Sequence, residues 1–423
     1  MTRTLAALQR IGLFGYLVMA SSLATGQELA SSASAKKIEL LGVAEVPGQA
    51  TDKSGLSAAL DGESCNNLLG GFSAMDYSAA ENCYYVLPDR GPLDGAVDWN
   101  CRVQLFAFSI DPTAAQVVTP LLQKTVLLRD ELGRPFLGSA ASIEADQDRA
   151  SRLDPEGIRV GTNGNLFISD EYGPHLLEFQ PDGRLVRRLP VPDHYLIQNP
   201  CPISDDENGV NISGRQGNRG MEGLAISPDG QRLWGLMQSP LLQDSDRTLK
   251  PNKPTGLNCR LLQLSVQGHG LGEQLYQLDG TENKLNEILM AGEHQFLCIE
   301  RDGEAGTAAQ FKKLMLIDTS SASNIASLER LPAHKLPRDV QGVDKRCLID
   351  LLDPQWKLAG DTMPEKIEAL SWGPDLADGR RTLLVGSDND FIANSPSYFY
   401  VFAIPEELLT FAPVLLAAPI SKN

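Results

Sequence analysis

A short motif that recurs through most of the chain constrains its fold more than any other feature. In each copy an acidic or glycine residue precedes a short apolar strand, a turn follows, and a second strand ends in polar residues. The first strands begin at Gly71, Glu156, Glu222, Glu287 and Glu368. Turn sequences such as Thr162-Asn163-Gly164 between the two strands favour hairpins. A third segment rich in aromatic and β-branched residues completes each copy, so the motif predicts repeated antiparallel strands.

The spacing of the copies indicates the architecture. They lie 65 to 86 residues apart, which suits the four-stranded blades of a β-propeller. One or two hairpins cannot bury a core alone, so we expect the blades to close into a ring. We count five repeats, and a sixth blade stays open in the irregular stretch 331–364. The last repeat lacks one strand, which residues 37–46 are expected to supply. The sequence therefore predicts an all-β propeller over residues 37–405 and a C-terminal tail over 406–423.

The first 26 residues have the pattern of an export signal. Arg3 and Arg10 supply positive charge, residues 11–20 are apolar, and Ala24-Thr25-Gly26 is a small-residue cleavage site. The apolar run is short for a membrane span, and an uncleaved anchor or a buried helix is the alternative. We expect residues 27–36 to form a flexible leader and the mature protein to be secreted or periplasmic, with no stable membrane span.

The seven cysteines form no CxxC motif, which leaves zinc-ribbon and thioredoxin chemistry without support. An oxidising compartment would allow disulfides. We expect Cys83 to pair with Cys101, because the two lie on neighbouring predicted strands. The odd number leaves at least one thiol unpaired or intermolecular.

The polar residues of the motif are expected to meet at one end of the propeller. The first strand of each blade lines the central channel, and its start lies beside the end of the antiparallel second strand. The predicted catalytic residues are Glu156, Asp170, Glu171, Glu222 and Glu368. The predicted metal ligands are Asp89, Glu156, Asp170, Glu222, Glu300, Asp388 and Asp390. The predicted substrate-binding residues are Arg90, Arg219, Arg301 and Gln238.

Carboxylates that converge repel one another, so they must protonate, pair with arginine or bind a cation. Oxygen ligands without histidine suit calcium better than zinc. The guanidinium fork of arginine binds two oxygens of a phosphate or carboxylate. Such a site would polarise a phosphoester and activate water. The alternative is structural: acidic residues at strand ends also cap turns and pair with arginines between blades.

Other chemistries find little support in the sequence. There is no GxSxG elbow, no Walker loop and no GxGxxG after a predicted strand. The formal net charge of −17 disfavours contact with the phosphate backbone of nucleic acids. We interpret Asp154-Pro155 as turn residues.

Taken together, the motifs GGFSAMDY with LPDRGP, DPEGIRV with SDEYGP, NRGMEGLAIS with LMQSP, and KIEALSW with GSDNDF resemble the phytase-like family, "esterase-like activity of phytase". The motifs run in order from about residue 70 to 391. Ala369 departs from the glycine usual after the glutamate. The resemblance implies a secreted or periplasmic propeller with phosphoesterase or esterase-like activity. A calcium requirement is implied by the broader likeness to propeller phytases.

Two classes of function follow. The first is a calcium-assisted hydrolase of a small phosphoester or ester, and the second is a non-catalytic propeller that binds a ligand or protein at the channel mouth. Propellers host both, so the fold alone does not choose between them. We expect a monomer.

Overall fold

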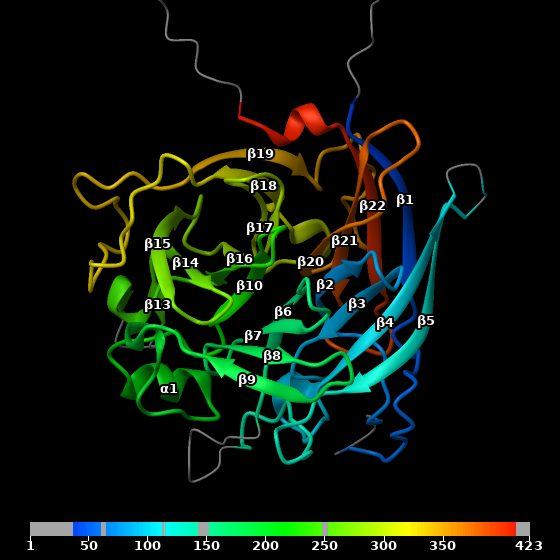
Figure 1. Cartoon of the computed structure of the whole chain (residues 1–423), viewed down its shortest axis with the longest axis horizontal. Helices are drawn as coiled ribbons and strands as arrows, with labels where there is room; N and C mark the ends of the chain where they lie inside the picture. The colour runs from blue at the N-terminus through cyan, green and yellow to red at the C-terminus, as the bar shows by residue number, and fades with distance from the viewer. Residues whose placement is uncertain are drawn as a thin grey trace, which may run out of the picture. The chain divides into compact units, whose positions relative to one another are not determined.

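Five strands surround the central channel, one from each repeat (Figure 1). The computed structural model describes residues 37–60, 65–111, 114, 116–142, 152–247 and 253–411. The innermost strands are β2 (Phe72–Ser78), β6 (Pro155–Val160), β10 (Met221–Ile226), β16 (Lys284–Met290) and β20 (Lys366–Trp372). Each begins a four-stranded antiparallel sheet, so the protein is a five-bladed β-propeller.

The remaining strands of each blade follow outward in chain order. The second strands are β3 (Cys83–Pro88), β7 (Leu166–Asp170), β11 (Arg232–Met237), β17 (Gln295–Arg301) and β21 (Arg381–Asp388). The third strands are β4 (Arg102–Ile110), β8 (His175–Phe179), β14 (Asn258–Ser265), β18 (Lys312–Asp318) and β22 (Ser397–Ile404). The outer strands are β5 (Val118–Leu127), β9 (Leu185–Leu189), β15 (Gly270–Gln277), β19 (Asp344–Asp350) and β1 (Glu39–Val46).

The last blade confirms the expected closure of the ring. Its outer strand β1 comes from the start of the described chain and pairs antiparallel with β22 near the C-terminus, from Glu39 opposite Ala403 to Val46 opposite Ser397. This pairing joins the two ends of the propeller in one sheet and leaves β20, β21 and β22 with their fourth strand. The open question of a sixth blade is settled in favour of five, because the stretch 331–364 contributes only β19, the outer strand of the fourth blade.

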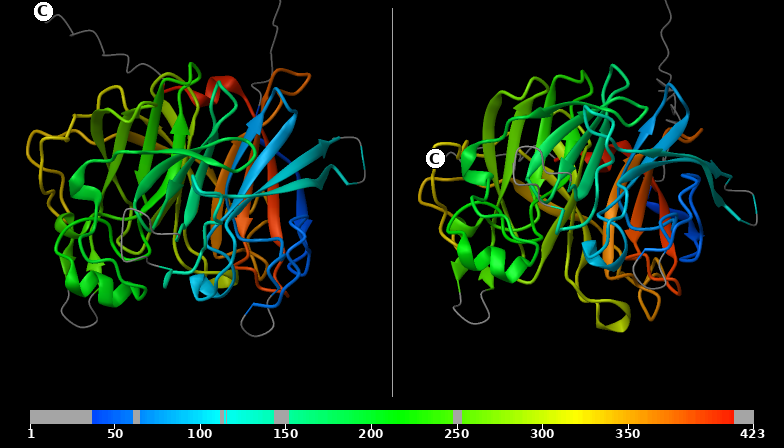
Figure 2. Two further views of the ribbon diagram at one scale, coloured as in Figure 1. Left: turned by 60° about the horizontal axis from the view of Figure 1, so that its bottom comes forward. Right: turned by 90° about the horizontal axis from the view of Figure 1, so that it is seen from below.

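A short helix, a two-stranded sheet and several 3-10 turns lie in the connections between strands and blades. The helix α1 (Ser204–Val210) lies in the long connection from β9 to β10, at the loop-rich end of the molecule (Figure 2). The separate two-stranded sheet of β12 (Asp246–Arg247) and β13 (Pro254–Thr255) lies in the connection from β11 to β14. The 3-10 turns are η1 (Pro92–Gly95), η3 (Asp193–Tyr195), η4 (Leu242–Asp244), η5 (Gly306–Ala308) and η6 (Glu406–Leu409). Leu409 of η6 is buried in the core, so the first residues of the expected tail pack on the propeller.

The apolar core is divided into five large clusters, one between each pair of neighbouring blades. Between the fifth and first blades, for example, Phe399 packs on Phe72 with ring centroids 5.6 Å apart. Every blade therefore buries both faces, which is why the second strands are apolar almost throughout. Burial of this area drives ring closure, at about 25 cal/mol per Å² of apolar surface.

All seven cysteines lie in the described residues, and all are free thiols. The expected pairing of Cys83 with Cys101 is wrong. Cys83 begins β3, whereas Cys101 immediately precedes β4, and these two strands are antiparallel with Tyr85 opposite Leu105. The two thiols therefore lie at opposite ends of the strand pair, far beyond the reach of a disulfide.

The predicted signal peptide and leader, and most of the predicted tail, lie outside the described residues. Within the described ranges, no helix has the length and apolar character needed to cross a bilayer.

Candidate functional site

A β-bulge at the same place in all five inner strands aims side chains into the channel mouth. The pairing of each inner strand with its second strand shifts register there, for example between Pro155 and Gly157 in β6. The residues inside the shifts are Ser73, Glu156, Glu222, Asn286 with Glu287, and Glu368. A bulge leaves its extra residue unpaired and re-aims the side chain. Three of the glutamates predicted from the motif occupy this position.

The ends of the second strands supply the neighbouring layer of the mouth. In each blade, one residue of the second strand pairs with the inner-strand residue just before the bulge, and the next residue along the second strand lies at the mouth. These next residues are Asp89, Glu171, Gln238, Arg301 and Asp388. Four are carboxylate or amide side chains and one is a guanidinium. All five were among the predicted site residues, and the structure places them at the same end of their strands.

A third position, two residues before the bulge, was not recognised from the sequence. It is occupied by Gly71, Asp154, Gly220, Lys284 and Lys366. Side chains two apart in an extended strand point to the same side, so this position also faces the mouth. Asp154, interpreted as a turn residue, is instead fully buried there. Because side chains alternate along a strand, the residue two positions before each motif glutamate or its equivalent also points to the mouth, and this rule identifies Asp154, Lys284 and Lys366.

Asp154, Glu156 and Glu171 form the first carboxylate group of the mouth, called here the Glu156 cluster. One oxygen from each lies within 4.8 Å of the others, and all three residues are buried. Arg90 neutralises one side: its Nη1 lies 2.8 Å from Asp154 Oδ2 and 3.7 Å from Glu171 Oε2. The Glu156 carboxylate accepts no hydrogen bond from any described residue. Among the described residues, Arg90 is therefore the one cation in direct contact with this cluster, and it contacts only Asp154 and Glu171.

Burial and like charge act together on the acids of this region. Desolvation, and then the neighbouring Asp154, raise the pKa of Glu171 to about 8, although Arg90 opposes the rise. The pKa of Glu156 is raised well above its usual value by burial and by the charges of Glu222 and Asp154. These shifts mean that the cluster is strained whenever its acids are ionised without a cation.

Glu222 and Glu368 continue the acidic side of the mouth. The Asn286 amide bridges them, with Nδ2 donating to Glu222 Oε1 at 2.7 Å and to Glu368 Oε1 at 2.9 Å. Arg301 Nη2 donates to Glu368 Oε1 at 2.6 Å. The other oxygen of Glu222 is buried and has no partner in the described chain. Burial, followed by the charges of Glu171 and Glu368, raises the pKa of Glu222 well above its usual value.

Asp89, Asp388 and Asp390 form a second carboxylate group, called here the Lys366 cluster. Their oxygens also lie within 4.8 Å of one another. Lys366 contacts both Asp388, at 2.9 Å from Oδ2, and Asp390. The lysine ammonium therefore supplies the positive charge that a metal would bring. Burial of Lys366 lowers its pKa, but these carboxylates outweigh that effect and hold the pKa well above the usual value.

Cationic side chains lie near the acids. Arg219 and Lys284 form no ion pair with any described carboxylate, and Arg301 lies close enough to lower the pKa of both. Burial, followed by Arg301 and Arg219, lowers the pKa of Lys284 to about 8. Positive groups held together without counter-ions are an anion-binding arrangement. The mouth therefore holds buried acids together with two cations, Arg219 and Lys284, that no described carboxylate contacts directly.

A buried arginine lies across the channel one step below the mouth. Arg159 lies on β6, and its Nη1 donates to Met75 O of β2 at 2.9 Å. Its Nη2 donates to Ile288 O of β16 at 2.7 Å and lies 3.1 Å from Glu287 Oε2. Glu287, although inside the bulge, lies with Arg159 below the mouth, and burial raises its pKa to about 8. The Arg159–Glu287 pair therefore occupies the channel just below the site.

Two predicted residues face away from the mouth. Asp170 and Glu300 precede Glu171 and Arg301, and alternate residues of a strand point to opposite sides. Glu300 accepts hydrogen bonds from Tyr276 Oη at 2.7 Å and Asn283 Nδ2 at 2.7 Å and pairs with Lys345, which makes it part of a separate network between blades. Asp170 accepts hydrogen bonds from the backbone N–H groups of Asp154, Tyr172 and Gly173.

The fold and site define a five-bladed propeller with a charged channel mouth. The chain belongs to the phytase-like family, described as "esterase-like activity of phytase", whose model matches residues 67–391. This confirms the resemblance drawn from the motifs.

One curated relative is an "uncharacterized secreted protein" of Arthroderma benhamiae, 26% identical over 337 residues, and the match covers 64% of each chain. Among solved structures, the chain is similar to a periplasmic gluconolactonase of Pseudomonas aeruginosa, with 12% identity, 87% and 100% of the two chains covered and a TM-score of 0.34. A streptogramin B lyase matches with 10% identity, 86% and 98% coverage and a TM-score of 0.34. Similarity at this level carries no information on the reaction.

Proposed function

We propose that this protein is an exported hydrolase that cleaves a small phosphoester or ester at the channel mouth with the help of calcium. The observation that carries the proposal is the combination of buried acids and cations at the mouth. The Glu156 cluster and Glu222 present buried carboxylates that no described cation touches except at the Arg90 edge. Arg219 and Lys284 present positive charge without a contacting carboxylate. Purely structural networks pair such groups, as the Lys366 cluster does.

The acidic side fits a calcium ion. Asp154, Glu156 and Glu171 offer oxygen atoms within 4.8 Å of one another, and calcium prefers several carboxylate oxygens. The unpartnered oxygen of Glu222 is not part of this group and stays free to act as a base. When bound, calcium would supply Lewis-acid polarisation of the phosphoryl or carbonyl oxygen.

The residues of the chain then divide the remaining work. Arg219, Arg301 and Lys284 bind the negatively charged oxygens of the substrate, with Arg301 held in place by Glu368. Glu222 accepts a proton from the attacking water, whose oxygen bonds to phosphorus or to the carbonyl carbon. The bond to the alcohol oxygen breaks, and that oxygen takes a proton from the Lys284 ammonium. A lysine with a pKa of about 8 suits proton donation near neutral pH.

The export half of the proposal has independent support. The first 26 residues carry the signal pattern, and the relative in Arthroderma benhamiae is described as secreted. Mass spectrometry of the native protein should find an N-terminus between about residues 20 and 30, the usual range for signal cleavage. An intact Met1 in the mature protein would contradict export with cleavage.

The decisive experiment is a hydrolysis screen of the purified mature protein with phosphoesters, carboxylic esters and lactones, with calcium and with a chelator. We expect turnover of at least one class that the chelator abolishes and calcium restores. Glu222→Gln should lower turnover about a hundredfold or more, in line with the loss of a general base. The control is Glu329→Gln, an exposed acid in the connection between β18 and β19. Binding without turnover, unaffected by Glu222→Gln, would establish the non-catalytic class instead.

A further inference from the structure

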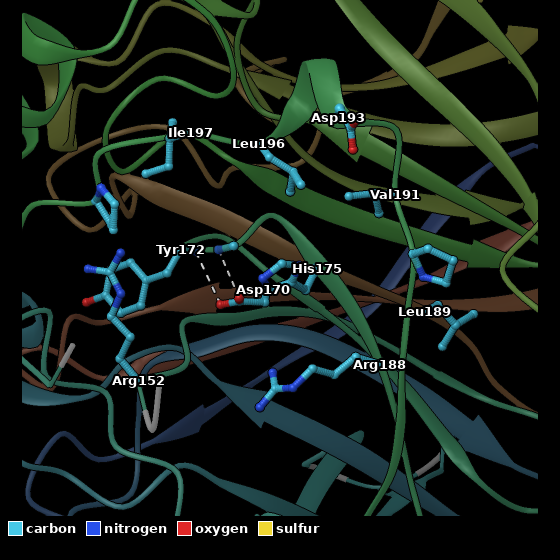
Figure 3. Close-up of a pocket in the computed structure, with 13 residues that line it drawn as sticks. Arg152, Asp170, Tyr172, His175, Arg188, Leu189, Val191, Asp193, Leu196 and Ile197 are labelled. Atoms are coloured by element: carbon cyan, nitrogen blue, oxygen red, sulfur yellow. Dashed lines mark hydrogen bonds between the residues drawn. The ribbon is translucent and has the colours of Figure 1, made fainter. Parts of the chain in front are cut away.

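A cavity of about 640 Å³ lies in the second blade, on the other side of the strand end that carries Glu171. It is bounded by the end of β7, the start of β8, the end of β9 and the connection that follows β9, and is called here the blade 2 pocket (Figure 3). Asp170 faces this pocket, while its neighbour Glu171 faces the channel. A volume of this size is typical of small-molecule sites.

Two guanidinium groups lie on one side of the pocket, those of Arg152 and Arg188 (Figure 3). Arg188 makes no hydrogen bond or ion pair with any described residue, and its guanidinium carbon lies 5.5 Å from the centre of the Phe136 ring. Arg152 is buried, lies over the Tyr172 ring at 4.8 Å and donates to Ala140 O at 3.1 Å. Neither guanidinium forms an ion pair with Asp170, because backbone N–H groups occupy that carboxylate.

The charges around this side do not cancel. Among the described residues, the carboxylate oxygen that lies closest to Arg152 belongs to Glu207, at 3.8 Å. Glu207 is already engaged by Arg215 and by the backbone N–H of Cys201 at 2.9 Å. Three arginines, Arg152, Arg188 and Arg215, therefore share two buried carboxylates, Glu207 and Asp170. A third carboxylate of the pocket, Asp193, lies on the opposite side and is exposed to solvent. This surplus of positive charge in a partly buried site favours an anion, and the arginine fork suits a pair of oxygen atoms.

The opposite side of the pocket is mainly apolar, and Asp193 on this side is exposed to solvent. Val191, Leu196 and Ile197 come from the connection after β9 and lie across the pocket from Arg188 (Figure 3). The pocket thus offers a charged end and a hydrocarbon wall within one cavity. A ligand that fits must carry an oxyanion at one end and an apolar body at the other.

We propose that the blade 2 pocket binds a small organic anion, with a carboxylate or phosphate head on Arg152 and Arg188 and an apolar body against Val191, Leu196 and Ile197. This site is independent of the chemistry at the channel mouth. It lies back to back with the Glu156 cluster, because the segment from Asp170 to Gly173 borders the pocket and Glu171 of the same segment belongs to the cluster.

Calorimetric titration tests this assignment with three probes of the same body: 1-naphthoate, 1-naphthyl phosphate and the neutral 1-naphthamide. The titrations are made in chelator, so that hydrolysis at the mouth does not consume the ester. We expect one or both anions to bind, and the amide to bind about tenfold or more weakly, which corresponds to the loss of a charge-assisted hydrogen bond. The two anions compared with each other distinguish a carboxylate site from a phosphate site.

The matched variants are Arg188→Met and Arg187→Met. These neighbours on β9 point to opposite sides, and Arg187 pairs with Glu178 at 2.6 Å away from the pocket. Arg188→Met should lower anion affinity about tenfold and leave the unfolding temperature nearly unchanged, since Arg188 bonds to no described residue. Arg187→Met should leave the affinity unchanged. Glu156→Gln, a change at the mouth, should also leave it unchanged.

Four results would overturn the assignment. The first is equal binding of amide and anions, and the second is equal loss of affinity in both arginine variants. The third is absence of anion binding at millimolar concentration. Loss of binding in Glu156→Gln would place the anion at the mouth and would also refute the pocket. None of these outcomes depends on whether the protein proves to be a hydrolase.

Discussion

The Glu156 cluster and the Lys366 cluster are built on the same frame but are neutralised differently. Each contains a second-strand carboxylate, Glu171 in one and Asp388 in the other, beside the bulge glutamate of its own blade. The position two residues before the bulge holds Asp154 in the second blade and Lys366 in the fifth. Where the lysine stands, it contacts two carboxylates. Where the aspartate stands, a third acid joins the group, and Arg90 reaches only one edge.

This difference shows how the same strand arrangement can leave the carboxylates neutralised in one blade and only partly neutralised in another. The fold requires only that each inner strand bulge and present side chains at the mouth. A lysine two residues before the bulge, as in the fifth blade, neutralises the nearby carboxylates, whereas an aspartate there adds another negative charge. We therefore expect the stability contributed by the two clusters to depend differently on Lys366, on pH and on calcium.

The largest expected effect comes from breaking the neutralised cluster. Lys366→Met leaves Asp388 and Asp390 without their cation, and loss of one partner of a buried pair costs about 3–5 kcal/mol. Denaturant unfolding should show this fall in the free energy of unfolding, and calcium should restore part of it because the cluster now needs a cation. Lys124→Met on the exposed outer strand β5 should change stability by less than about 0.5 kcal/mol. Equal stabilities of the two variants would mean that Lys366 is not the cation of its cluster.

The second effect is the pH dependence of the calcium-free protein. The pKa of Glu171 is about 8 in the folded protein, above its usual value, so the folded state holds the proton more tightly than the unfolded state. Its contribution to stability is present at low pH and is lost as the pH rises from about 4.5 through 8, by on the order of a few kcal/mol. Glu171→Gln should flatten this part of the stability curve in chelator. A slope that persists unchanged in the variant would assign the protons elsewhere.

Calcium itself should separate the clusters. At about 100 times its dissociation constant, a ligand of the folded state adds about 2.7 kcal/mol to the free energy of unfolding. Glu156→Gln should remove most of this gain, whereas Asp390→Asn in the Lys366 cluster should keep it. Thermal unfolding with and without calcium measures both. If Asp390→Asn abolished the response and Glu156→Gln did not, the cation would belong to the other cluster.

The smallest expected effect concerns the cationic side. Burial beside Arg301 and Arg219 lowers the pKa of Lys284, so the folded state disfavours the ammonium. Stability should rise as the pH increases from about 8 to 10.5, and Lys284→Met should add on the order of 1 kcal/mol at pH 7 while weakening any anion-dependent activity. Chemical denaturation beside an activity assay checks both. A loss of stability would show that Lys284 has a partner that holds its charge.

The sequence by itself determined the closed ring of blades and the end of the channel at which the charged residues lie. The recurring strand pairs and their spacing predicted blades, residues 37–46 were expected to close the ring, and Glu156, Glu222 and Glu368 were placed at the mouth. These inferences succeed because hydrophobic alternation, turn residues and the order of antiparallel strands are local properties, and they repeat.

Only the tertiary structure decided which acids are compensated. Glu300 and Arg301 are neighbours in the sequence, yet the register shift in β16 and the alternation of β17 send one to the network between blades and the other to the mouth. Lys284 and Lys366 were not recognised because the same position holds glycine in two other blades and aspartate in the third. The contacts that neutralise or strain a carboxylate join strands of different blades. They exist only once the ring has closed, and no local pattern in the chain encodes them.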